Sequence, residues 1–324
     1  MTAESYPRWG LVGVGREGSD LASWILERAT SDSVDDRVLL VTSNVADVRA
    51  SLDRIEAAVV DRNAIGDDRV AVVGSRLGPE TSVFAGDRMA LEEFPDIFES
   101  TTDVLGDADA LLYTVALGGG TESGMVSPVI DRLARAPAAG VPSDAAADPT
   151  AETNADADEE WLSSLSQFVV ATTPFESAGT RQHFNAVCLL SQLLGAGDRT
   201  GADLTLLASS TELKAQFDGS GAGDGETGAP LADEDAIDDR IATAVDLFVG
   251  AGRQADHPID DRDFLRARRP GTDSTASHGT FGLARDLPIE LDLSAAIDRA
   301  AENAFVPLDL STVESAFAVV RAPA

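Results

Sequence analysis

Two glycine-rich stretches of this sequence have the residue types and the spacing that suit the binding of phosphate groups. They are Gly13-Val14-Gly15-Arg16-Glu17-Gly18 and Gly118-Gly119-Gly120-Thr121-Glu122-Ser123-Gly124. Because glycine has no Cβ, its backbone can approach an anion closely, and several N–H groups can point at one phosphate. In the second stretch, the hydroxyls of Thr121 and Ser123 add two more donors. These residues therefore suit the binding of a nucleotide's phosphates by backbone and hydroxyl groups.

The first stretch is the less specific of the two. Its G-x-G-x-x-G spacing suits a nicotinamide dinucleotide equally well, and it also fits a tight strand-to-helix turn that binds nothing. The second stretch has four glycines in seven positions, which favours an anion-binding loop over a flexible loop without a ligand. Since the two stretches lie about 100 residues apart, they could grip one nucleotide at two edges.

The elements around these stretches alternate between strands and helices. The apolar runs predict strands at 9–14, 38–42, 70–73, 110–116, 168–172, 204–208, 280–284 and 317–321. The helical spacing of apolar residues predicts helices at 19–29, 45–60, 89–105, 127–136, 181–194, 234–250 and 294–304, with Pro95 interrupting the third of them. This alternation predicts an α/β fold with a Rossmann-like parallel sheet covered by helices on both faces.

Net charge is the strongest global feature of the chain. Its 324 residues carry 56 acidic and 24 basic side chains, for a net charge of −32, and Lys214 is the only lysine. Such a surface repels itself at low salt and is screened at high salt, so we interpret it as halophilic, archaeal-type adaptation to a salt-rich cytoplasm. An acidic surface for a basic partner is the alternative. Without a basic stripe, nucleic acid is not an expected partner.

Several other kinds of site are not expected. Cys188 is the only cysteine, which excludes a disulfide and a cysteine metal site. His183, His257 and His278 lie far apart in the sequence and form no i, i+4 pair, so no metal or catalytic-triad role is assigned to them. No stretch approaches the roughly 18 apolar residues of a membrane-spanning helix, and the first nine residues lack the features of a signal peptide. We therefore expect a cytoplasmic protein.

The second glycine stretch resembles the phosphate signature of the tubulin/FtsZ superfamily, G-G-G-T-G-S-G or G-G-G-T-G-T-G. Four further features resemble that family and follow in the family's order. They are a first nucleotide loop at 13–20, a ribose loop at 172–181 (T-x-P-F-x-F-E-G-x-x-R in the family), a central helix at 235–248 and a partner-reaching loop at 256–264. Together they span nearly the whole chain, which we identify as a diverged, halophile-type FtsZ-like or CetZ-like member.

The resemblance implies a domain organisation and a function. Residues 1–232 would form a GTPase-like nucleotide-binding domain with an acidic insertion at about 137–160. Residues 233–252 would form the central helix, and 253–324 a shortened α+β C-terminal domain. The implied function is that of a cytoskeletal protein in cell division or cell shape. It would bind GTP or GDP with Mg²⁺ and assemble head-to-tail with itself or with FtsZ/tubulin-like relatives.

The resemblance also implies roles for individual residues. Nucleotide would be held by Gly13, Gly15, Arg16, Glu17, Gly18, Gly118, Gly119, Gly120, Thr121, Glu122, Ser123, Gly124, Pro174, Arg181 and Asp238. Asp260 and Asp263 match the acidic positions of the family's N-x-D-x-x-D loop, in which Pro258 replaces the Asn. They would orient the water that attacks the γ-phosphate of the neighbouring subunit's GTP. An ordinary acidic turn is the alternative, because such turns are common in this chain.

Several positions depart from the family pattern. Glu122 stands where the family has Gly, and a carboxylate about 4 Å from a phosphate costs on the order of 4 kcal/mol unless it swings away or meets a cation. Ala178 and Gln182 replace a Glu and an Arg of the ribose loop, and Ser209-Ser210 stand where an Asn is usual. These changes and the short C-terminal part support a second hypothesis, a pseudo-GTPase that binds nucleotide weakly or not at all and regulates or caps active relatives. A third, an NAD-dependent dehydrogenase, rests on the first glycine stretch alone.

Overall fold

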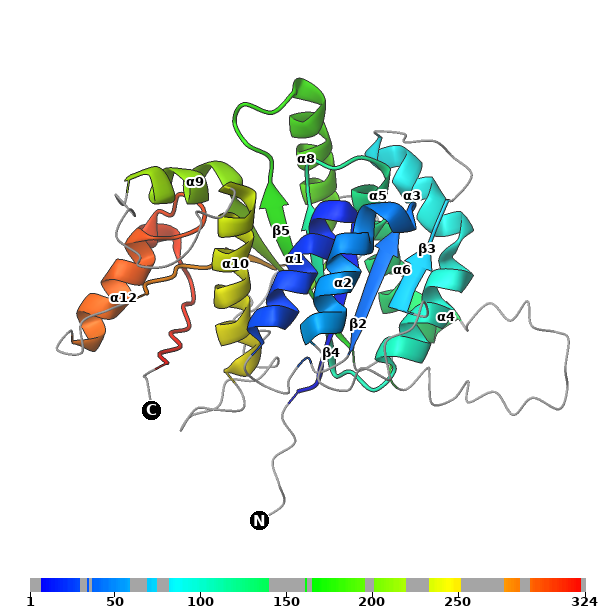
Figure 1. Ribbon diagram of the computed structural model, residues 1–324, viewed down its shortest axis with the longest axis horizontal. Helices are drawn as coiled ribbons and strands as arrows, with labels where there is room; N and C mark the ends of the chain where they lie inside the picture. Colours follow the sequence, from blue (N-terminus) through cyan, green and yellow to red (C-terminus); the bar gives the residue numbers. More distant parts are fainter. Residues whose placement is uncertain are drawn as a thin grey trace, which may run out of the picture.

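The computed structural model describes residues 7–29, 34, 37–58, 69–74, 82–139, 161, 165–195, 201–219, 233–251, 277–285 and 292–321. These residues fold around one sheet of seven parallel strands in the order β3-β2-β1-β4-β5-β6-β7 (Figure 1). The strands are β1 Trp9–Val14, β2 Val38–Thr42, β3 Val70–Val72, β4 Ala110–Ala116, β5 Ser166–Thr173, β6 Leu204–Ser209 and β7 Ser277–Thr280.

Helices cover both faces of the sheet. On one face, the core contains apolar residues of α1 Gly15–Arg28, α2 Arg49–Ala58, α9 Ser210–Gly219 and α10 Asp233–Gly250. On the other face, it contains residues of α3 Val83–Glu92, α4 Phe94–Leu105, α6 Val126–Ala139 and α8 Thr180–Leu193. The remaining elements are η1 Val45–Val48, α5 Thr121–Gly124, α12 Leu293–Glu302 and η4 Leu310–Thr312.

Burial on both faces explains why the central strands are apolar throughout. Every residue of β1 and of β4 is buried. A strand that is covered on both sides has no polar face, so it reads as a continuous apolar run. Each central strand therefore stands out in the sequence, and its end marks where a loop must leave the sheet.

An aromatic chain fixes α10 to the sheet. The ring of Phe248 on α10 lies 5.5 Å from that of Trp9 and 5.9 Å from that of Phe168. It also lies 5.9 Å from Phe281, whose ring is 5.9 Å from that of the fully buried Phe305. Tilted and edge-to-face pairs at these distances add to the stabilisation from burial. This row of contacting aromatic rings links the centre of the sheet to the segment that follows β7.

The predicted α/β class with a parallel sheet is confirmed, and most differences are at element boundaries. The predicted helix at 89–105 is two helices, α3 and α4, that meet at Glu93, with Pro95 in the first turn of α4. The strand predicted at 280–284 is β7 at 277–280, and α9 has no counterpart among the predicted elements. The prediction of a strand at 317–321 is wrong, because this segment joins no sheet. It contacts α10 through an ion pair between Arg321 and Asp246 at 2.8 Å.

The predicted division into domains is not tested by the structure. β7 is hydrogen-bonded to β6 as the edge strand of the same sheet, and the whole region 253–276 lies outside the described residues. The acidic insertion predicted at about 137–160 is likewise described only at its start, where α6 extends to Ala139, and at Trp161 just beyond it. In the described part of the chain, no helix is long and apolar enough to cross a membrane.

Replacing Phe248 with alanine should lower the free energy of unfolding by about 3–5 kcal/mol, because a large buried ring is lost and a cavity remains. Urea or thermal unfolding in molar KCl would measure the loss. Phe84→Ala is the matched control, since the Phe84 side chain is 56% exposed on α3, and it should cost less than about 1 kcal/mol. Equal losses for the two variants would contradict the role given to the aromatic chain.

Candidate functional site

The strand order of the sheet reverses between β1 and β4. Chain order runs from β1 through β2 to β3 on one side and from β4 through β5 to β6 on the other. In open parallel sheets, ligands bind in the crevice that forms at such a point, beyond the carboxyl ends of the strands. Both glycine stretches begin there, because β1 and β4 pair in parallel with Val14 opposite Val115. The sheet therefore brings the two predicted phosphate loops together.

The three glycines of the first loop have different structural roles. A Cβ on Gly13 would lie 2.8 Å from the Cα of Ser19, and a Cβ on Gly18 would lie 2.3 Å from the carbonyl oxygen of Thr114. These two glycines therefore let α1 pack closely on the sheet, and the Thr114 hydroxyl donates to the carbonyl of Gly18 at 2.7 Å. Gly15 has a φ of +69°, a left-handed conformation that favours glycine, and it faces the second loop.

The second loop is held by residues from α8 and from the segment after β5. The Asn185 side-chain amide donates to the carbonyl of Gly119 at 2.9 Å. Asn185 is buried, with a relative exposure of 5%. Pro174 packs against Gly118, where a Cβ would come within 3.1 Å of the proline Cβ. Sequence reasoning missed Asn185, whose position one turn after the start of α8 gave no signal of its contact with a loop 66 residues away.

The last part of the second loop packs against α3. A Cβ on Gly124 would lie 2.2 Å from the carbonyl oxygen of Val83, and a Cβ on Gly86 would lie 1.8 Å from that of Thr121. These glycines let the backbones of α3 and α5 touch. Thr121 and Ser123 are buried, so their hydroxyls lie inside the loop.

The side chain of Glu122 extends from the second loop toward the first loop. Its Oε1 atom accepts hydrogen bonds from the Ser43 backbone N–H at 2.6 Å, the Ser43 hydroxyl at 2.7 Å and the Thr42 hydroxyl at 2.9 Å. Its Oε2 atom lies 2.9 Å from the position that a Cβ on Gly15 would take. The carboxylate therefore lies at the carboxyl ends of β1 and β2, where three donors from β2 and the residue after it hold it.

A group of acidic side chains lies where α1 and α10 begin. Burial, and after it the nearby charges of Asp20, Asp235, Glu17 and Glu234, raise the pKa of Asp238 to about 8. The pKa of Glu17, an exposed residue, is also raised, first by loss of solvent around its carboxyl group and then by the charge of Glu234. Asp238 is thus largely a neutral acid at neutral pH, able to donate as well as accept a hydrogen bond.

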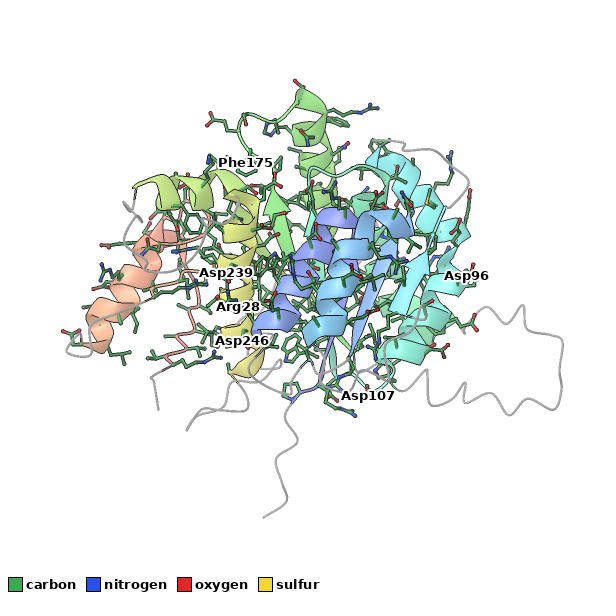
Figure 2. All side chains as sticks on the ribbon, in the orientation of Figure 1. Arg28, Asp96, Asp107, Phe175, Asp239 and Asp246 are labelled. Carbon is green, nitrogen blue, oxygen red and sulfur yellow. The ribbon has the colours of Figure 1, made fainter. Side chains whose placement is uncertain are left out.

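The neighbouring residue Asp239 anchors α10. Asp239 is buried and forms ion pairs with Arg28 of α1 and, at 3.0 Å, with Arg285. Figure 2 shows Arg28 and Asp239 together between these two helices. Arg285 also donates to the hydroxyl of Thr243. These contacts fix the start of α10 and thereby the place of Asp238 beside the first loop.

The other predicted site residues lie at the rim or outside the described residues. Arg16 is exposed, as is Arg181 in the first turn of α8. Gln182 caps that helix by accepting a hydrogen bond from the N–H of Gly179 at 3.1 Å. The predicted catalytic residues Asp260 and Asp263 lie outside the described residues. Among the side chains that the structure does describe, no group of three or more His, Cys, Asp or Glu is arranged to hold a metal ion.

No protein-family model and no curated protein matches the sequence, but solved structures match the fold. CetZ from Methanosaeta thermophila has a TM-score of 0.63 and 18% identity, covering 94% of this chain and 71% of that chain. CetZ2 from Haloferax volcanii, a GTPγS-bound protofilament, has a TM-score of 0.55 and 19% identity, covering 86% of this chain and 66% of that chain. An empty FtsZ dimer from M. jannaschii has a TM-score of 0.52 and 16% identity, covering 82% of this chain and 61% of that chain.

These likenesses show that the chain has the fold of the tubulin/FtsZ superfamily. The chain covers between 61% and 71% of the length of the three structures. The sequence-based assignment to this superfamily is therefore confirmed at the level of the fold.

Gly15→Ala should lower the free energy of unfolding by about 1–3 kcal/mol, because a Cβ at positive φ is strained and would also press on the Glu122 carboxylate. In a Glu122→Gly background the loss should be smaller by about 1 kcal/mol, since only the backbone strain remains. A double-mutant cycle by chemical unfolding measures this coupling. Gly179→Ala, at a position with nothing within 4 Å of the added Cβ, is the control. A coupling of zero would show that Gly15 and Glu122 are not in contact.

Asp238→Asn should make stability less dependent on pH. The pKa of Asp238 is about 8 in the folded protein against an ordinary value of 3.8, so the folded state holds an extra proton between these values. Stability then falls as pH rises through this window, by up to about 1.4 kcal/mol per pH unit. The variant's advantage over the parent should grow from about pH 5 to 8 and then level off, as measured by thermal unfolding.

The control for this prediction is Asp298→Asn, which removes one carboxylate from the exposed surface of α12. An advantage of Asp238→Asn that stays constant across the pH range would contradict the burial of a neutral acid at this position.

Proposed function

We propose that this protein binds a guanine nucleotide in the crevice between its two glycine loops. One observation carries the proposal. The loops after β1 and β4 touch each other, with Glu122 of the second loop against Gly15 of the first. Two loops that meet at a strand-order reversal form one binding site, whereas loops that pointed into separate pockets would not.

The parts of a nucleotide would meet chemically suitable groups along this crevice. The N–H groups of residues 13–18 and 118–124 would face the phosphates, together with the positive end of the α1 dipole. Residues 172–181, with Pro174 against Gly118, would lie along the ribose. Asp238 would face the base. The donors of Thr42 and Ser43 suit anionic oxygens, because they already hold a carboxylate oxygen at 2.6 to 2.9 Å. Bound Mg²⁺ would neutralise part of the phosphate charge.

The proposed function includes head-to-tail assembly in the cytoplasm, in a division or cell-shape role. The matched CetZ2 structure is a protofilament, and the matched FtsZ structure is a dimer. In such an assembly Asp260 and Asp263 would reach the nucleotide of the next subunit and orient the attacking water. Since those carboxylates would act only across a subunit contact, an isolated subunit would be nearly inactive.

A second candidate function is that of a pseudo-GTPase that regulates or caps active relatives. The observation in its favour is the position of Glu122, because the carboxylate lies inside the crevice and is held by three hydrogen bonds. Such a protein would keep the fold and the contacts with its relatives but would bind nucleotide weakly or not at all.

Titration with labelled GTP, GDP and NAD in molar KCl with Mg²⁺ tests the proposal. We expect guanine nucleotides to bind and NAD not to bind. GTP turnover that rises with protein concentration would identify the active filament-forming function, and weak or absent binding of every nucleotide would identify the pseudo-GTPase. The double variant Asp260→Ala, Asp263→Ala should lose turnover at least about 10-fold and keep its affinity. Binding of NAD alone would contradict both functions.

A further inference from the structure

We infer that Glu122 is a built-in anion that occupies one phosphate position of the crevice, so that the site prefers a guanosine diphosphate to a triphosphate. This inference rests on the proposed function and specifies its ligand. It follows from three features of the described residues, namely the donors that Glu122 uses, the space that it fills and the acidic group at the starts of α1 and α10.

The donors around the carboxylate are of the kind that bind phosphate. One backbone N–H and two hydroxyls converge on Oε1 within 2.9 Å. Oxygen anions in proteins are held by groups of this kind, and a carboxylate oxygen and a phosphate oxygen compete for them directly. While Glu122 is in place, Ser43 and Thr42 offer these hydrogen bonds to the protein itself and not to a ligand.

The carboxylate also fills the space above the first loop. Its Oε2 lies 2.9 Å and its Cβ 3.1 Å from the position of a Cβ on Gly15. The left-handed φ of Gly15 and its missing side chain leave room for a close neighbour at this point. That neighbour is Glu122 of the second loop. A phosphate in the same place would overlap with the carboxylate.

A separate group of acidic side chains, at the starts of α1 and α10, adds to this effect. Glu17 and Asp20 lie on α1, and Glu234, Asp235 and Asp238 lie on α10, close enough to influence one another's charge. Arg16 offsets part of their effect on Glu17. Each phosphate added to a nucleotide brings further negative charge toward this group. The fixed carboxylate of Glu122 is the charge that lies within the crevice itself, so it determines the penalty for the last phosphate.

A purely structural role for Glu122 makes a different prediction. If the carboxylate only tied α5 to the end of β2, its removal would lower stability and would change the affinities for all nucleotides by the same factor. If it occupies a phosphate position, its removal changes the ratio of the affinities for GTP and GDP. The ratio is therefore the decisive measurement.

The experiment measures the affinities of GTP, GDP and GMP for the full chain and for two variants, in molar KCl with Mg²⁺. The parent protein should bind GDP at least about 10-fold more tightly than GTP. Glu122→Gly, which removes both charge and bulk, should raise GTP affinity at least about 10-fold more than GDP affinity. Glu122→Gln keeps the bulk and should fold even if the glycine variant does not, and it should give a smaller change in the same direction.

Pyrophosphate provides a readout that does not involve the base. It should raise the melting temperature of Glu122→Gly by several degrees more than that of the parent protein. Glu99→Gln, on the exposed surface of α4, removes the same charge at a distance and should leave the ratio unchanged.

The outcomes separate the two proposals. Equal affinities of the parent for GTP and GDP, or an unchanged ratio in both Glu122 variants, would overturn the role of Glu122 while leaving guanine-nucleotide binding intact. If neither the parent nor any variant binds a guanine nucleotide, both the proposed function and this inference are wrong.

Discussion

The parallel pairing of β1 with β4 is the constraint on which the rest of the crevice depends. These two strands are separated by about 100 residues in the chain, yet they are adjacent in the sheet and end level with each other. Because strand order reverses at this pair, no crossover helix covers the space beyond their carboxyl ends. Both glycine loops must leave the sheet there. Close packing of α1 on the sheet, which Gly13 and Gly18 permit, then fixes the first loop opposite the second.

The chemistry of the crevice is set by a conflict between its backbone and its side chains. Glycine loops and a helix N-terminus favour anions, whereas the starts of α1 and α10 carry acidic groups that raise one another's pKa. In the described residues, the protein resolves part of this conflict by giving three donors to its own Glu122 and by keeping Asp238 largely neutral. Buried Asp239 is instead neutralised by Arg28 and Arg285. Asp238 and Asp239 are adjacent on α10, and each avoids an unpaired buried charge differently. Asp238 is largely protonated, whereas Asp239 is ion-paired.

The sequence was sufficient to predict the sheet, because a strand buried on both faces is a continuous apolar run and β1, β2 and β4 were predicted with correct limits. It was not sufficient for short or exposed segments. Residues 317–321 are apolar enough for a strand, yet Arg321 attaches this segment to Asp246 and no partner strand is present in the described residues. The glycine loops could be found because their spacing is local. Asn185 and the partners of Glu122 could not, since contacts over 66 to 80 residues depend on the completed fold.

The backbone contacts of Gly86 and Gly124 join α3 to the second loop without any side chain between them. A backbone-to-backbone contact contains no side-chain rotamers that could adjust, so we expect α3 and α5 to move as one rigid unit. Glu122 lies in this loop, and Phe84 lies on the exposed surface of α3 directly after Val83, the residue that contacts Gly124. A shift of the second loop would therefore require the start of α3 to shift with it.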